Sequence, residues 1–320
     1  MEIDAARERF RRLWREVRDV QSSRALLEWD QETYMPPLGA ARRGEVLATL
    51  AGIEHERLTA PALAEAVEAM AGPETDPFAE WPAQAREARR RIRRATALPR
   101  RLAEELAQAA SAGLAAWQEA RAKRDFALFA STLERLLQLK REEATCLADG
   151  GRPYDALLDD YEPGATEADL LPLFGALRGR LVPLVRAIVE SGRMVDETPL
   201  QGRFPMEAQR QLGHYVAGEI GFDWQGGRLD RSAHPFCTGI ANRDVRLTWR
   251  GQEQDLRQAL MGVLHEMGHG LYDQGLPAEW ESTPLGEPAS TGVHESQSRL
   301  WEILVGRGRP FWRWLLPHVR

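Results

Sequence analysis

Residues 265–269 read His-Glu-Met-Gly-His, and this string is the strongest constraint that the sequence places on the fold. Residues four apart on a helix lie on one face, so a helix here would let His265 and His269 bind one metal ion through bonds of about 2.0–2.1 Å. Glu266 would point to the side of this pair, where it could reach a water molecule beside the metal without being a ligand. The string therefore predicts a helix that carries a metal site, with Glu266 as the general base.

A second short string, His294-Glu295-Ser296-Gln297, supplies a candidate for the third ligand. A catalytic zinc ion usually has three protein ligands and keeps a fourth position for water. Glu295 lies in a stretch of helical period, Thr291–Val305, and could complete the site from a second helix. The glycines on either side of the second histidine, Gly268 and Gly270, would let another backbone come close.

The alternative interpretation is purely structural. It is a helix with two histidines on its surface, and a Glu295 that is an ordinary helical carboxylate. With 7 histidines in 320 residues, chance would place a His-Glu-x-x-His string in such a chain with a probability on the order of one per cent. The two strings taken together favour the metal site.

The composition is that of a globular enzyme with an acidic balance. The chain has 320 residues, 43% hydrophobic and 28% charged, enough for one large or two small domains. Its net charge of −6 disfavours binding to nucleic acid or to an anionic membrane. Its two cysteines, Cys146 and Cys237, fit a reducing compartment, and neither a signal peptide nor a membrane-spanning apolar run is visible. A cytoplasmic location is expected.

A basic run from Arg86 to Arg101 contains eight arginines and has two interpretations. Such a run can bind phosphate backbones. This one has no interleaved aromatic residue and lies in an acidic chain, so a solvated helix face is the favoured interpretation.

Most of the sequence has a period near 3.6, which predicts a mostly helical protein. Helices are expected over residues 4–34, ended by Pro36-Pro37, and over residues 41–70. Two more amphipathic helices are expected to turn their apolar faces inward. Their apolar positions are Leu102, Leu106, Ala110, Leu114 and Trp117 in the first and Phe126, Phe129, Leu133, Leu136 and Leu137 in the second.

Two local signals add detail to the later half of the chain. Thr166 and Asp169 have the spacing of a capping box that opens another helix. The helical period breaks only near residues 222–252, where polar and apolar residues alternate over 244–249 as in a half-buried strand. The prediction is a single, mostly helical domain over residues 1–320, with a small sheet beside the metal-binding helix.

Six short stretches stand in order along the chain and together resemble a known family. They are LEWDQETYMPP at 27–37, YDALL to YEPG at 154–164, His-Pro-Phe at 234–236, Asp-x-Arg-x-Thr at 244–248, and the two strings at 265–269 and 294–297. The chain resembles the M32 metallocarboxypeptidases, the thermostable carboxypeptidase type, from near its N-terminus to its last residue.

The resemblance implies a large helical zinc-peptidase fold of the gluzincin type and a role for each motif residue. It implies a zinc ion, with cobalt acceptable, and a substrate cleft lined by the His-Pro-Phe and Asp-x-Arg-x-Thr segments. The implied residues are His265, His269 and Glu295 as metal ligands, Glu266 as the catalytic base, and His234 and Arg246 as substrate-binding residues.

Other interpretations of three of these side chains stay open. His234 could be a polar turn residue, because it precedes a proline. Arg246 could belong to a surface ion pair with Asp244 on the predicted strand. His214 lies outside any motif and is expected to be structural.

The function that the resemblance implies is a metal-dependent carboxypeptidase. It would hydrolyse the C-terminal peptide bond of peptides with a free C-terminus, using zinc-activated water with Glu266 as general base. A full-length chain would form a homodimer. A related zinc endopeptidase or dipeptidase is the alternative, because the metal motif alone does not separate these classes.

The family's two later motifs have no match in these 320 residues. One, Arg-x-x-Ala-Asp, is thought to bind the terminal carboxylate of the substrate, and the other, Gly-x-x-Gln-Asp-x-His-Trp, lies near the reacting carbonyl. The catalytic domain is therefore expected to be shortened at its C-terminus and to have little or no carboxypeptidase activity alone, and a non-catalytic metal-binding chain is a further alternative. An exposed apolar patch is also expected near the C-terminus, at Phe311, Trp312, Trp314, Leu315 and Leu316.

Overall fold

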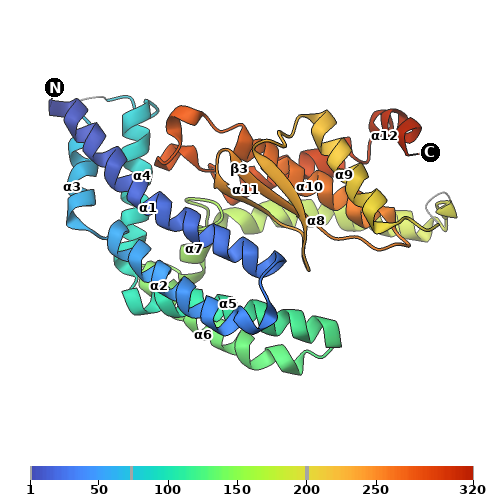
Figure 1. The fold of residues 1–320 in the computed structure, drawn as a ribbon, viewed down its shortest axis with the longest axis horizontal. Coiled ribbons are helices and arrows are strands. Elements are labelled where there is room, and N and C mark those ends of the chain that lie inside the picture. Colours follow the sequence, from blue (N-terminus) through green and yellow to red (C-terminus); the bar gives the residue numbers. More distant parts are fainter. Residues whose placement is uncertain (1, 73–74, 199–201, 320) are drawn as a thin grey trace.

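The computed structural model describes residues 2–72, 75–198 and 202–319. Helices dominate it, and one small sheet lies among the later helices (Figure 1). The mostly α-helical fold that the sequence predicted is therefore confirmed. The early helices are α1 (Glu2–Thr33), α2 (Ala40–Leu58), α3 (Pro61–Met70), α4 (Glu80–Ala97), α5 (Arg100–Lys123), α6 (Ala127–Leu147), α7 (Pro153–Leu158) and α8 (Glu167–Glu190). The later elements are α9 (Met206–Ile220), β1 (Gly227–Arg231), β2 (Cys237–Ala241), β3 (Asp244–Trp249), α10 (Leu256–Gln274), α11 (Thr291–Arg299), a π-helix named η5 (Leu300–Val305) and α12 (Arg309–Leu315).

The first long helix follows the prediction and the second does not. Helix α1 ends at Thr33, before the two prolines. The single helix expected over residues 41–70 is wrong, because the chain breaks between α2 and α3. Pro61 has no N–H to continue the hydrogen bonds of α2, whereas its fixed φ suits the first position of α3.

One hydrophobic cluster joins the first four helices. Phe10, Trp14 and Val17 lie on one face of α1 and are buried. They pack against buried residues of α3 and α4, among them Leu63 and Ala85. Burial of such side chains stabilises a fold by about 1.5–3 kcal/mol each before entropic costs, so this cluster holds the N-terminal helices together.

Four of the six arginines of α4 form ion pairs with acidic side chains: Arg89, Arg90, Arg91 and Arg94. Arg89 forms a bidentate pair with Glu68 of α3, with N···O distances of 2.7 and 2.6 Å. Arg90 and Arg94 both reach Asp159, just after α7, at 2.8 and 3.1 Å. The solvated helix face expected here is therefore only partly correct. Arg86, Arg89 and Arg93 are exposed, whereas Arg90, Arg91 and Arg94 are partly buried and tie α4 to its neighbours.

The inward faces expected for the next two helices are only partly correct. Helix α5 packs between α2 and α6, and Leu102 at its start is fully buried. In contrast, Phe126 and Leu137 are exposed. Phe126 directly precedes α6, and Leu137 lies within it.

The sheet forms where the helical period breaks, and it supports α10. Its strand order is β1-β3-β2, with β1 parallel and β2 antiparallel to the central strand β3. The predicted strand over 244–249 is confirmed as β3, and its apolar residues Val245, Leu247 and Trp249 are buried. They belong to a second hydrophobic cluster with α9, α10 and α12. The sheet thus lies beside the helix with the His-Glu-x-x-His string, as predicted.

The apolar C-terminal patch expected from the sequence is mostly buried, so that expectation is wrong. Phe311 and Leu315 of α12 lie inside the second cluster, and Trp312 and Trp314 pack against its edge. Only Leu316 is exposed. The seven-residue helix turns its apolar side onto α9 and α10, a contact that its sequence alone did not reveal.

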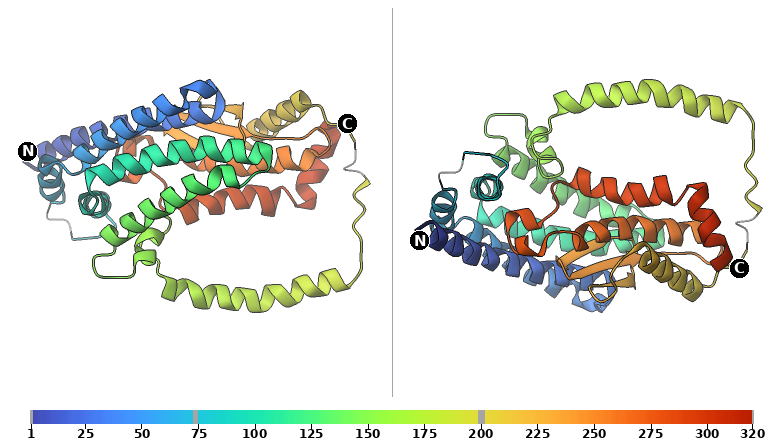
Figure 2. Two further views of the ribbon diagram at one scale, coloured as in Figure 1. Left: turned by 90° about the horizontal axis from the view of Figure 1, so that it is seen from below. Right: turned by 90° about the horizontal axis from the view of Figure 1, so that it is seen from above.

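Many exposed large apolar side chains lie instead on α8. The predicted capping box is present, with the Thr166 hydroxyl accepting from the Asp169 N–H and the Asp169 carboxylate accepting from the Thr166 N–H. No described residue of α8 is buried, and Figure 2 shows this helix running along one side of the molecule apart from the other helices. Its exposed apolar residues are Leu171, Leu173, Phe174, Leu177, Leu181, Val182, Leu184, Val185, Ile188 and Val189. None of the helices in the described ranges is long and apolar enough to cross a membrane.

Candidate metal centre

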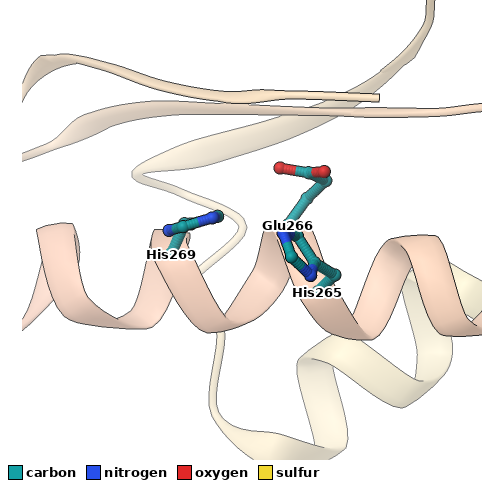
Figure 3. A group of neighbouring side chains, drawn as sticks. All are labelled: His265, Glu266 and His269. Carbon is teal, nitrogen blue, oxygen red and sulfur yellow. The ribbon is translucent and has the colours of Figure 1, made fainter. Parts of the chain in front are cut away.

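Helix α10 presents the predicted metal string from the centre of the second hydrophobic cluster. Its first turn is capped by the side chain of Asp255, which accepts from the N–H of Arg257. Figure 3 shows His265, Glu266 and His269 leaving the same stretch of this helix. One ligand atom from each of these three side chains lies within 4.8 Å of the others. The structure thus brings together the residues that the four-residue spacing predicted.

Helix α11 delivers Glu295 to the two histidines. Glu295 Oε2 lies 3.5 Å from His265 Nε2 and 3.3 Å from His269 Nε2. For metal bonds of about 2.0–2.1 Å at tetrahedral angles, neighbouring ligand atoms lie about 3.3–3.4 Å apart. Both distances from Glu295 Oε2 to the histidine nitrogens therefore match two edges of a tetrahedral site. A donor set of two imidazoles and one carboxylate suits a divalent ion such as zinc.

The protonation states of His269 and Glu295 also suit the binding of a cation. Burial, and then the neighbouring His294 and His265, lower the pKa of His269 to about 4, so its ring is neutral at pH 7, the form that binds metals. Burial alone would raise the pKa of Glu295, but a hydrogen bond from Arg299 and the two histidines leave it lowered. His269 Nδ1 is buried without a hydrogen-bond partner in the described chain.

Glu266 occupies a different environment from Glu295. Its side chain is buried on the side of α10 that faces the sheet, and burial, followed by the charges of Glu295 and Glu302, raises its pKa to about 8. A cation beside it would favour the ionised form. A carboxyl group whose pKa is raised to near neutral pH can accept and return a proton, which is the property of a general base and acid.

Three residues near the site were missed in the sequence. Glu302 accepts from His265 Nδ1 at 3.0 Å, and Arg299 donates to the second oxygen of Glu295 at 2.7 Å. Asp273 Oδ1 lies 3.0 Å from His294 Nε2. One signal could have found Glu302, because it stands seven residues after Glu295, a spacing that returns to the same helix face.

Two further motifs meet each other through β3. The Thr248 side chain of Asp-x-Arg-x-Thr accepts from the N–H of Phe236 at 2.8 Å, and its backbone N–H donates to the Phe236 carbonyl at 2.8 Å. Pro235 faces α10 at Gly262, one turn before the metal string. The His-Pro-Phe and Asp-x-Arg-x-Thr segments are therefore neighbours beside α10.

The two predicted substrate-binding side chains lie outside the histidine–carboxylate cluster. Arg246 forms a bidentate pair with Asp244, both distances 2.8 Å, and stacks 4.2 Å from the ring centre of Trp29 in α1. His234 is exposed, with its ring 6.5 Å from that of Trp117. Among the described residues, no hydrogen bond or ion pair joins either side chain to His265, His269 or Glu295.

Comparison with known proteins agrees with the geometry. A family model described as carboxypeptidase Taq (M32) metallopeptidase matches residues 9–320. The chain is 42% identical to thermostable carboxypeptidase 1 of Thermus thermophilus over 331 aligned positions, covering 100% of this chain and 65% of that protein. It is 34% identical to carboxypeptidase 1 of Bacillus subtilis, covering 98% of this chain and 62% of that protein. The chain thus spans slightly less than two thirds of the length of these relatives.

Solved structures give the same result. The crystal structure of BsuCP superposes with a TM-score of 0.93 at 32% identity, covering 98% of this chain and 63% of that one. The M32 carboxypeptidase from Deinococcus radiodurans superposes with a TM-score of 0.85 at 36% identity, with the same two coverages. On the family match, the identities and the shared fold, this chain belongs to the M32 metallopeptidase family.

Proposed function

We propose that this chain carries the metal centre of a metal-dependent carboxypeptidase. One observation carries the proposal: Glu295 Oε2 meets the Nε2 atoms of His265 and His269 at 3.5 and 3.3 Å, with Glu266 beside them. Relatives in the same family are named carboxypeptidases, which supports peptides with a free C-terminus as substrates. Zinc is the proposed ion, because two imidazoles and one carboxylate are its usual catalytic ligands, and cobalt is an acceptable substitute.

The residues of the chain have distinct parts in the proposed hydrolysis. A divalent ion held by His265, His269 and Glu295 would supply Lewis-acid chemistry toward water and toward a peptide carbonyl. Glu266 accepts the proton of the attacking water and returns it to the amine that leaves. Its buried position keeps this proton transfer away from bulk solvent. His234 and Arg246 remain proposed substrate-binding residues, and His234 is the more available of the two because Asp244 already pairs with Arg246.

The experiment compares two peptides that differ only at the C-terminus. The zinc-loaded 320-residue chain is incubated with a peptide that ends in a free carboxylate and with its amidated twin, and released amino acids are quantified over hours with and without chelator. We expect slow, chelator-sensitive release from the free peptide alone. Internal cleavage of both peptides would favour a zinc endopeptidase instead. Stoichiometric zinc without any release would favour a non-catalytic metal-binding chain.

Three properties of the whole molecule belong to the same proposal: its domain extent, its location and its oligomeric state. We propose that residues 1–320 form one catalytic domain, that the protein acts in the cytoplasm, and that the full-length form is a homodimer. Analytical ultracentrifugation tests the dimer, and limited proteolysis tests whether the two hydrophobic clusters unfold as one unit.

A further inference from the structure

A second layer of charged side chains surrounds the candidate metal centre. His265 uses both ring nitrogens: Nε2 faces Glu295 Oε2 at 3.5 Å, and Nδ1 lies 3.0 Å from Glu302 Oε2. A neutral imidazole has one N–H donor and one bare nitrogen. An acceptor at Nδ1 holds the proton there and leaves Nε2 bare for a metal ion, with the ring fixed in plane.

Glu302 is itself held in place from two sides. Its side chain is only 14% exposed, and Oε1 accepts from Arg307 Nη2 at 3.0 Å. Arg299 Nη1 lies 3.5 Å from Oε2, the oxygen that faces His265. Because charge-assisted bonds to a guanidinium fix both distance and direction, the carboxylate has little freedom to turn away from the histidine.

Arg299 also connects this layer to the proposed ligand Glu295. Its Nε donates to Glu295 Oε1 at 2.7 Å, so the other oxygen, Oε2, is left for the two histidines. One arginine thus sets the orientation of the carboxylate in the site and contacts the carboxylate behind it.

The backbone between these residues has an unusual form. Helix α11 ends at Arg299 and continues directly into the π-helix η5, which contains Glu302. A π-turn widens the helix, shifts the direction of the side chains that follow it, and is frequent at functional sites. Here the change of helix type lies between Glu295 and Glu302, which both contact His265 of α10.

His269 differs from His265 in the surroundings of its Nδ1 atom. Its Nδ1 is buried and has no hydrogen-bond partner in the described ranges, whereas His265 Nδ1 has Glu302. Of the two proposed histidine ligands, only one is therefore fixed by a carboxylate. The affinity of the site for metal should depend strongly on that one contact.

We propose that Glu302, aligned by Arg299 and Arg307, is a positioning residue that fixes the tautomer and ring orientation of His265 for metal binding. The proposal rests on the proposed function, because it assumes that His265 is a ligand. Loss of such an outer carboxylate typically weakens metal affinity about 10–100-fold.

The test measures metal affinity rather than turnover. Zinc affinity of the 320-residue chain is determined by competition with a chromophoric chelator for the wild type, Glu302→Ala, Glu302→Gln and Glu143→Gln. Glu143 is the matched control: it is a similarly buried glutamate on α6, paired with Lys140 at 2.6 Å and away from α10. The visible spectrum of the cobalt-loaded protein reports the ligand geometry, and the melting temperature of the metal-free protein reports the fold.

We expect Glu302→Ala to weaken zinc binding about 10–100-fold and to change the cobalt spectrum. Glu302→Gln should lose less than about tenfold, because its amide oxygen still accepts from Nδ1. Glu143→Gln should match the wild type. If Glu302→Ala fails to fold, a severalfold loss in Glu302→Gln together with a changed cobalt spectrum supports the proposal on its own.

Two results would overturn the proposal. Zinc affinities of both Glu302 variants within about twofold of the wild type would show that His265 needs no positioning. A lower melting temperature of the metal-free protein with an unchanged cobalt spectrum would assign Glu302 to the fold alone. A wild-type chain that binds no zinc would remove the metal centre itself, whereas zinc lost in His269→Ala but kept in the Glu302 variants would overturn only this inference.

Discussion

Gly268 of α10 lies directly against the backbone of α11 at Gln297. A Cβ atom at Gly268 would stand 2.6 Å from the Gln297 carbonyl oxygen and 2.6 Å from the Cα of Ser298. Such distances are well inside van der Waals contact, so only glycine allows this approach. Because Glu295 precedes Gln297 by two residues, the same contact brings its carboxylate to the histidines.

The first prediction concerns this contact. Gly268→Ala should push α11 away from α10, destabilising the protein by about 1–3 kcal/mol and weakening zinc binding. Alanine has about 1 kcal/mol better helix propensity than glycine, but the clash is with backbone, which cannot move cheaply. Urea unfolding and chelator competition measure the two effects.

Gly270→Ala is the matched control for that variant. Its Cβ would meet the side chains of Phe222 and Leu247, at 2.7 and 2.8 Å, and not α11. It should therefore lower stability while zinc affinity stays close to that of the wild type. Equal zinc affinity in both variants would separate the α10–α11 contact from the metal centre.

The second prediction concerns His269 as a ligand. Protein purified without chelator should contain about one equivalent of a divalent ion, and His269→Ala should lose most of it. His214→Ala is the control, because His214 stacks on Trp224 at 3.9 Å and lies on α9, outside the site. Full metal content in His269→Ala would remove His269 from the ligand set.

The third prediction separates metal binding from proton transfer. Glu266→Gln should keep the metal but lower kcat by at least about 10²–10⁴-fold, because glutamine cannot accept a proton from water. Elemental analysis and peptide hydrolysis on the same sample measure the two properties. Near-normal kcat would exclude Glu266 as the base.

The parts of the fold that could be predicted are those determined by local sequence. The spacing of His265 and His269 requires a helix, and alternation over residues 244–249 requires a strand, so α10 and β3 were both expected. The break at Pro61 was also visible in the sequence, but the apolar period on both sides of it favoured one helix. The burial of α12 depends on contacts with α9 and α10, which are distant in sequence.

The residues of the candidate site also fall into two groups, those that short sequence strings revealed and those that depend on the fold. The proposed ligands and the proposed base follow from residue types that metals and proton transfer require, so short strings reveal them. Glu302 and Arg299 act through geometry that depends on the π-turn after α11 and on the packing of α11 against Gly268. The seven-residue spacing from Glu295 to Glu302 is visible in the sequence, but it does not show that Glu302 contacts His265 Nδ1, which required the structure.

The fourth prediction concerns the exposed face of α8. Ten of its apolar residues, from Leu171 to Val189, are at least one third exposed, and such a surface favours self-association and dye binding. The double variant Leu177→Ser/Leu181→Ser should bind less of a hydrophobic dye and scatter less light than the wild type. Leu38→Ser, at a fully exposed and isolated position, is the control and should change neither signal. Unchanged dye binding in the double variant would place the apolar surface elsewhere.

The last prediction concerns acid stability at the junction of α4 and α7. Burial would raise the pKa of Asp159, but the N–H of Gly164 and the guanidinium groups of Arg90 and Arg94 outweigh it and leave the pKa lowered. A carboxyl whose pKa is lower in the folded state than in the unfolded state, about 3.9, stabilises the fold above that pH, and this stabilisation is lost as the pH falls through the folded value. Asp159→Asn should therefore be less stable than the wild type at pH 7, and the difference in free energy of unfolding should shrink below about pH 4. Urea unfolding of both proteins between about pH 3 and 7 measures this difference, and one that stays constant with pH would show that the charge of Asp159 does not stabilise the junction.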